Sequence, residues 1–223
     1  MKKQSATFLE GEADNYFLRN KAALDSRATS ENGFFEVDWL AQTLKPFNNK
    51  IVSLLEIGCS NGVNLARMCD LLHAKGEGID PSELAVTAGN LGFGNGGQIQ
   101  LHVGTASSLS FKTQSFDFVF FGFCLYLLDR SDLLAAIAEA DRVLKSGGFL
   151  AITDFDPINR QKKSYHHTDG VFSFKQDYSQ LFTAGGAYYL AAKISYSHRQ
   201  LFFDEDGNER VSTTLLFKEI DAY

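Results

Sequence analysis

The residues best suited to chemistry lie in a glycine turn between an expected strand and an expected helix. The apolar run 51–55 has the length and branched content of a buried strand, and 63–72 repeats apolar residues at helical spacing. Gly58 and Gly62 bracket the crossing, where glycine allows a positive φ and a close approach of a ligand to the backbone. The next helix offers unpaired N–H groups. This turn predicts a nucleotide-like ligand; the alternative is a plain turn with glycines for geometry only.

A carboxylate ends the next expected strand. The segment 75–82 reads Lys-Gly-Glu-Gly-Ile-Asp-Pro-Ser, and Asp80 lies 80 − 62 = 18 residues beyond Gly62. In a βαβ unit this spacing brings the carboxylate beside the glycine turn, where it can accept hydrogen bonds from ribose hydroxyls. Alternatively, Asp80 only complements the dipole of a helix that Ser82 begins.

The elements that position these groups alternate between strand and helix patterns. An almost entirely apolar strand over 116–121 is typical of burial on both faces, and an amphipathic helix is expected over 129–144. Two alternating segments, 188–203 and 210–220, form an expected antiparallel hairpin. The predicted fold class is α/β, a Rossmann-like doubly wound sheet of seven strands, mostly parallel, with further strands at 98–103 and 149–154.

The flanking segments are less regular. We expect residues 1–48 to form an N-terminal helical lid, with a helix over 35–44 that ends before Pro46, and residues 49–223 to complete a single domain. The segment 155–168 is expected to be irregular, followed by a helix over 174–184.

The composition limits the partners. A net charge of −6 disfavours nucleic acid and favours a small or neutral substrate. Three scattered cysteines predict neither a disulfide framework nor a zinc site, so no metal and a cytoplasmic location are expected. The N-terminus lacks the apolar run of a signal peptide, and the apolar window 116–128 is too short to span a bilayer. Monomer and homodimer both stay open.

Five segments, in order, resemble the class I S-adenosylmethionine-dependent methyltransferases. The resemblance covers about 50–154 by motif and the remainder by topology. The glycine turn matches the acidic-x-Gly-x-Gly-x-Gly motif of that family except at Ser60, where the family often has glycine and where serine fits if its φ is negative. The matching segments are 56–62, 78–80, 104–106, 115–119 and 138–148.

The resemblance implies a cofactor site for S-adenosyl-L-methionine. The methionine part would be surrounded by Glu56, Gly58, Cys59, Ser60 and Gly62. Asp80, next to Pro81, would hold the ribose hydroxyls. Thr105 and Ala106 would flank the adenine, and Phe121 and Gly122 would lie beside the sulfonium.

Methyl transfer from a sulfonium is an in-line displacement that orientation and exclusion of water can accelerate, so a general base is optional. The candidates for a base are Tyr126, which is alternatively a packed core tyrosine, and His166 and His167, which are alternatively only exposed. Substrate contacts are expected from Asp154 and Asp156 after the fifth strand, and from Tyr16 and Arg19 near the N-terminus.

The predicted function is methyl transfer to a small-molecule acceptor. The segment 15–20 resembles one found in some methyltransferases associated with surface-sugar biosynthesis, which suggests a sugar or nucleotide-sugar. One alternative is a non-catalytic S-adenosylmethionine-binding partner subunit. A second is an NAD-dependent oxidoreductase, although its Gly-x-Gly-x-x-Gly fingerprint differs from the spacing of Gly58 and Gly62.

Overall fold

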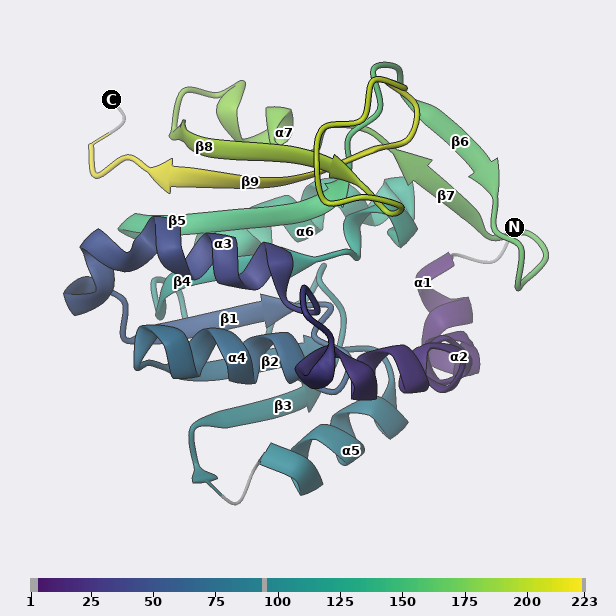
Figure 1. Ribbon diagram of the computed structural model, residues 1–223, viewed down its shortest axis with the longest axis horizontal. Helices are drawn as coiled ribbons and strands as arrows, with labels where there is room; N and C mark the ends of the chain where they lie inside the picture. The colour runs from purple at the N-terminus through teal and green to yellow at the C-terminus, as the bar shows by residue number, and fades with distance from the viewer. Residues whose placement is uncertain (1–3, 94–95, 222–223) are drawn as a thin grey trace.

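The computed structural model describes residues 4–93 and 96–221, and a seven-stranded sheet forms its centre (Figure 1). The strand order is β3-β2-β1-β4-β5-β9-β8. Strands β1 to β5 run parallel, and β9 pairs antiparallel with both β5 and β8. The predicted α/β sheet and its C-terminal hairpin are confirmed. The strands are β1 (Ser53–Ile57), β2 (Lys75–Asp80), β3 (Ile99–Val103), β4 (Phe116–Gly122), β5 (Leu144–Phe155), β8 (Tyr188–Ser197) and β9 (Arg210–Lys218).

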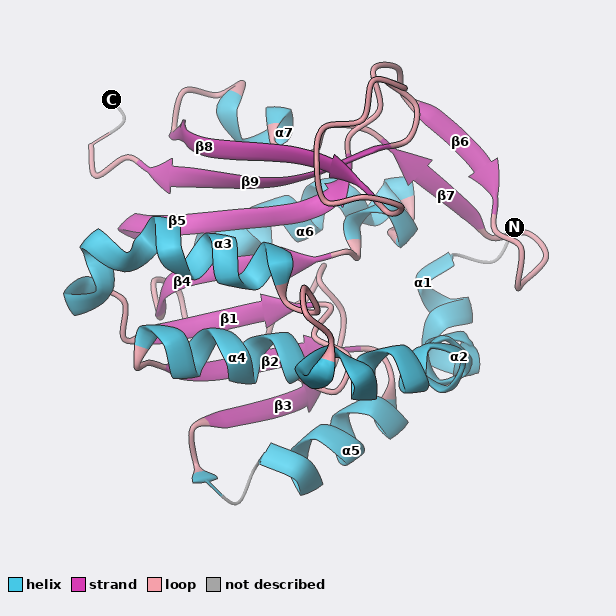
Figure 2. Cartoon of the chain, in the orientation of Figure 1, coloured by secondary structure: helices cyan, strands magenta, loops and turns pink. Residues whose placement is uncertain are grey.

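Helices cover both faces of this sheet (Figure 2). One face packs against α3 (Phe35–Leu44), α4 (Val63–Leu72) and α5 (Glu83–Phe93). The opposite face packs against α6 (Arg130–Val143) and the short α7 (Gln180–Thr183). Two apolar clusters therefore cover the two faces of the sheet, and the parallel strands end at the same edge.

The N-terminal segment lies across that carboxyl edge. It consists of α1 (Gln4–Thr7), a π-helical turn (Phe8–Glu12) and α2 (Ala13–Ser26), followed by a 3₁₀ turn (Arg27–Thr29). Three polar side chains tie it to the rest of the chain. Gln4 Nε2 donates to Leu127 O (2.6 Å) and Phe172 O (2.8 Å), Glu12 Oε2 accepts from Thr168 Oγ1 (2.7 Å), and Asp14 Oδ1 accepts from Ser82 Oγ (2.7 Å).

The region after β5 differs from the prediction. Instead of an irregular segment and a helix over 174–184, β6 (Gln161–Ser164) and β7 (Phe172–Lys175) form a separate antiparallel ribbon, and only Gln180–Thr183 is α-helical. Phe172 and Phe174 alternate with polar residues, which suits a strand, and the Lys162 ammonium lies 3.9 Å from the Phe172 ring centre. The polar sequence of β6 carried no apolar alternation that could have revealed it.

Within the described part of the chain, no helix has both the length and the apolar character needed to cross a bilayer.

Candidate active site

A cavity of about 590 Å³ lies at the carboxyl edge of the parallel strands, beneath the N-terminal helices. Its wall includes the turns that follow β1, β2, β3 and β4, together with residues of α2 and the loop after β8. This edge of an open α/β sheet is where ligands bind, at the point where strand order reverses between β1 and β4. The volume is in the range of cofactor and small-molecule sites.

The glycine turn needs left-handed backbone at three positions. Gly58 has φ 78°, Ser60 has φ 49° and Gly62 has φ 74°. Ser60 therefore does not meet the condition of a negative φ under which serine would fit this turn without strain; its N–H donates to Asp80 Oδ2 at 2.8 Å. Gly58, Cys59 and Ser60 line the cavity, whereas Gly62 begins α4 behind it.

Asp80 joins the first two turns of the sheet edge. Its Oδ2 accepts from the Ser60 N–H, and its Oδ1 accepts from the Ser82 N–H at 2.9 Å. Burial raises the pKa of Asp80 to about 6 even though both hydrogen bonds favour the charged form. Each carboxylate oxygen can accept a further hydrogen bond, so Asp80 supports the helix start and still faces the cavity.

The residues that the sequence analysis assigned to adenine, and Pro81 beside them, lie together in space. Pro81, Thr105 and Ala106 all line the cavity, and Ser107 follows them. A Cβ on Gly104 would lie 2.6 Å from Ile79 Cδ1, so the β3 turn packs directly on β2. This close packing brings the turns after β2 and β3 to one wall.

Glu56 lies behind the cavity wall and not on it. Its side chain is 1% exposed, and its Oε1 accepts from Asn64 Nδ2, which does line the cavity, at 3.5 Å. Oε2 has no hydrogen-bond partner among the described residues. Burial raises the pKa of Glu56 to about 8, so the side chain is a neutral acid at neutral pH. A Cβ on Gly122 would lie 2.7 Å from Oε1, which shows how closely β4 covers this acid.

Arg27 was not found by sequence reasoning. It follows α2, lines the cavity and forms an ion pair with Glu36 at the start of α3. The Arg27 Nε is buried and has no hydrogen-bond acceptor within residues 4–93 and 96–221. It stands in a polar stretch without any motif, so only the packing of α2 against the sheet edge places a guanidinium here.

Aromatic side chains form another part of the cavity wall. Tyr126 and Phe123 from the β4 side, Phe155 from the end of β5 and His198 after β8 contact one another. The ring centres of Tyr126 and Phe155 are 5.0 Å apart, and those of His198 and Phe155 are 5.1 Å apart. Burial and a hydrogen bond with Tyr16 raise the pKa of Tyr126, so its phenol is a proton donor at neutral pH. We call Phe123, Tyr126, Phe155 and His198 the aromatic cage.

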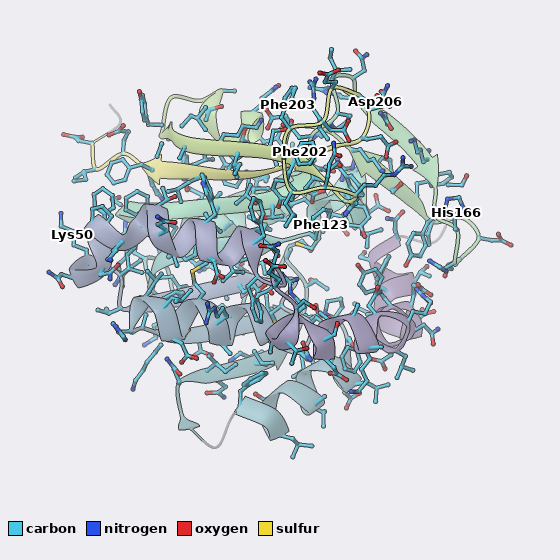
Figure 3. All side chains as sticks on the ribbon, viewed as in Figure 1. Lys50, Phe123, His166, Phe202, Phe203 and Asp206 are labelled. Atoms are coloured by element: carbon cyan, nitrogen blue, oxygen red, sulfur yellow. The ribbon has the colours of Figure 1, made fainter. Side chains whose placement is uncertain are left out.

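Several residues predicted from the sequence lie elsewhere. Phe121 and Asp154 are fully buried beside Phe120 and Thr153, which line the cavity instead, because successive side chains of a strand point to opposite faces. Figure 3 shows His166 in the outer turn of the β6–β7 ribbon, away from Phe123. Three other predicted residues also lie outside the cavity lining. His167 is exposed in the same turn, Arg19 donates to Glu12 and Tyr165, and Asp156 forms an ion pair with Lys193 at 2.9 Å.

The buried carboxyl groups predict how stability depends on pH. Burial raises the pKa of Glu56 to about 8, of Asp154 to about 7 and of Asp80 to about 6, whereas unfolded carboxyls titrate near 4. The free energy of unfolding that these three protonated groups contribute is therefore fully present below about pH 4. It is lost as the pH rises through their folded pKa values of about 6 to about 8. We expect the melting temperature of the ligand-free protein to fall by at least about 5 °C between pH 5.5 and 8.5.

Calorimetry at both pH values checks this dependence. Glu56→Gln should flatten it, whereas Glu31→Gln, at an exposed position, should leave it as in the parent. A melting temperature that rises with pH, or an unchanged slope in Glu56→Gln, would contradict the burial argument.

Known proteins share both the sequence pattern and the fold. Residues 54–148 match the methyltransferase domain family. The chain is 32% identical over 117 residues to demethylmenaquinone methyltransferase of Bacillus pumilus (strain SAFR-032); the match covers 50% of this chain and 49% of the relative, so the chain spans about half the length of that curated relative.

Solved structures resemble the whole architecture. Burkholderia thailandensis 1,6-didemethyltoxoflavin-N1-methyltransferase superposes with a TM-score of 0.67 at 12% identity, over 96% of this chain and 87% of the other. The MccD protein superposes with a TM-score of 0.63 at 18% identity, over 84% and 98%. These structures share the fold of this chain, and by sequence its residues 54–148 are similar to the methyltransferase domain family.

Proposed function

We propose that this protein transfers a methyl group from S-adenosyl-L-methionine to a small-molecule acceptor bound in the same cavity. The observation that carries the proposal is the continuity of the cavity: the glycine turn and Asp80 share it with the aromatic cage. A binding site for the donor and an apolar chamber for an acceptor therefore lie in one continuous cavity, as a direct transfer requires.

The residues present fit the donor. Arg27 Nε and Asn64 Oδ1 are buried without partners among the described residues, at a wall that also holds Gly58. A donor's amino-acid part carries the carboxylate and ammonium groups that would satisfy them. Asp80 would accept from the ribose hydroxyls, and the turn Thr105–Ser107 would flank the adenine. When bound, the donor supplies a methyl group activated by a sulfonium.

The protein's own contribution is orientation and dehydration. The aromatic cage presents ring faces and few polar atoms, so it favours a flat or cationic ligand group and excludes water from the transfer. We propose that the N-terminal segment acts as a lid over residues 49–223, because Gln4, Glu12 and Asp14 anchor it across the cavity.

The charges of the cavity lining favour an acceptor without phosphate over the nucleotide-sugar that the resemblance at 15–20 suggested. Tyr16 lines the cavity, but Arg27 is the single lysine or arginine among the described lining residues, and we have assigned it to the donor's amino-acid part beside Glu36. A nucleotide-sugar diphosphate would lack a free cation to bind, which favours an acceptor without phosphate. The names of demethylmenaquinone methyltransferase and 1,6-didemethyltoxoflavin-N1-methyltransferase also support a small molecule.

The alternatives predict different outcomes in two measurements. Calorimetric titration with S-adenosylhomocysteine tests binding, and transfer of a labelled methyl group to a panel of phenols, N-heterocycles, amines and sugars tests turnover. We expect binding and turnover on a ring compound. Binding without turnover on any acceptor would support a non-catalytic subunit, and preferential binding of NADH would support an oxidoreductase.

The role of Arg27 gives a separate prediction. Arg27→Ala should weaken S-adenosylhomocysteine binding by about 10- to 100-fold, because a hydrogen bond to a charged group contributes about 1.5–3 kcal/mol. 5′-Methylthioadenosine, which lacks the amino-acid part, should bind Arg27→Ala and the parent protein alike. Calorimetric titration of both ligands checks this, and an equal loss for both would mean that Arg27 only supports the fold.

A further inference from the structure

The loop after β8 brings a histidine into the cavity that no sequence motif indicated. His198 is the first residue beyond β8, and it lines the cavity together with Leu201 of the same loop. Its ring centre lies 5.1 Å from the centres of both Phe123 and Phe155. Among the histidines that the structure describes, His198 alone belongs to the lining. An imidazole therefore stands in the aromatic cage.

The ring nitrogens of His198 are available to a ligand. Neither has a hydrogen-bond partner among residues 4–93 and 96–221, whereas Tyr126 in the same cage is bound to Tyr16. The charged groups around His198 are Lys175 on β7, whose ammonium lies 3.6 Å from the Phe155 ring centre, and Glu209 at the end of the loop. Desolvation by the neighbouring rings, and secondarily Lys175, lower the pKa of His198, although part of its side chain is exposed.

We infer that His198 is the general base of the transfer and that the acceptor is a flat aromatic compound with an ionisable ring O–H or N–H. This rests on the proposed function. The other candidates are less suited: Tyr126 holds its proton, and Asp154 is 3% exposed behind the wall. A flat ring matches the faces of Phe123 and Phe155, and its O–H or N–H can then meet the imidazole.

The proton and the electrons balance without another reactant. The acceptor's oxygen or nitrogen gives its proton to the free imidazole nitrogen as its electron pair forms the bond to the methyl carbon. The carbon–sulfur bond breaks, and its electron pair stays on sulfur. The His198 side chain is exposed to solvent on its outer side, so the imidazolium can release the proton to water after the transfer.

A spectroscopic probe tests this without turnover. 4-Nitrophenol is a flat aromatic compound whose phenolate absorbs visible light. Bound to the parent protein together with S-adenosylhomocysteine, it should show the phenolate band at a lower pH than in water, because the imidazolium of His198 stabilises the anion. In His198→Gln this downward shift should be lost, so that the phenolate band no longer appears at a lower pH than in water. S-adenosylhomocysteine should bind with unchanged affinity. The control His102→Gln, at a β3 position paired with Glu77 outside the cavity, should behave like the parent.

Turnover gives a second readout once the panel yields an acceptor. His198→Ala should lower kcat by about 10²- to 10⁴-fold, and added imidazole should restore part of it. The inference is overturned if 4-nitrophenol does not bind, if its titration is the same in His198→Gln, or if His198→Ala keeps kcat within threefold. The proposed function fails separately, through absence of S-adenosylhomocysteine binding to the parent protein.

Discussion

Asp80→Ala should reduce S-adenosylhomocysteine affinity by at least about 100-fold, since two hydrogen bonds to a charged acceptor contribute about 1.5–3 kcal/mol each. The carboxylate has a double task in this structure. It accepts from the Ser60 N–H at 2.8 Å and the Ser82 N–H at 2.9 Å, and we propose that it also accepts from the ribose hydroxyls. Its removal therefore takes away ligand contacts and also releases Ser60 from its left-handed conformation (φ 49°).

Asp80→Asn separates these two effects. The amide keeps one acceptor oxygen and nearly the same shape, so the turn should stay folded while affinity falls by an intermediate factor. Calorimetric titration and thermal melting of both variants give affinity and stability side by side. An Asp80→Ala protein that is folded and binds within threefold of the parent would contradict the ribose assignment.

Gly58→Val should abolish measurable binding of S-adenosylhomocysteine. The residue has φ 78°, a conformation that a β-branched side chain resists. In addition, a Cβ at this position would lie 2.5 Å from Cys124 Cβ and 2.9 Å from Cys124 Sγ. Cys124 itself lines the cavity, so any displacement that relieves the clash narrows the site or moves the turn away from it.

The matched control is Gly92→Val. This glycine lies near the end of α5, where an added Cβ would meet nothing within 4 Å, so binding should be unchanged. If Gly58→Val does not fold, Gly58→Ala combined with Cys124→Gly removes the contact but keeps the backbone strain, and it should bind more tightly than Gly58→Ala alone. Normal affinity in folded Gly58→Val would place the donor elsewhere.

The helices and strands of the first βαβ unit, and the helix before it, could be predicted from the local spacing of apolar residues. The helices 35–44 and 63–72 begin and end where the apolar spacing placed them. Gly58 and Asp80 could be paired in advance because a βαβ unit has nearly fixed geometry, in which two parallel neighbours end at the same edge. In the structure Ile57 of β1 pairs with Ile79 of β2, which places Gly58 and Asp80 side by side at the ends of these strands.

Strand alternation limited the residue-level prediction at two places. The sequence indicates that β4 and β5 end at this edge of the sheet, but whether Phe121 or its neighbour faces the cavity depends on the phase of the pleat. In the structure Phe120 and Thr153 line the cavity, whereas Phe121 and Asp154 are buried in the core.

The sequence alone predicted which residues of the first three turns line the cavity: the glycine turn, Asp80, Thr105 and Ala106, all placed by short-range spacing. Tertiary structure decided the rest. Arg27 and His198 come from opposite ends of the chain, in segments with no periodic pattern, and they share one cavity only because α2 and the loop after β8 pack over the same sheet edge. The raised pKa of Glu56 likewise follows from burial, which is a property of the folded chain and not of the residue type.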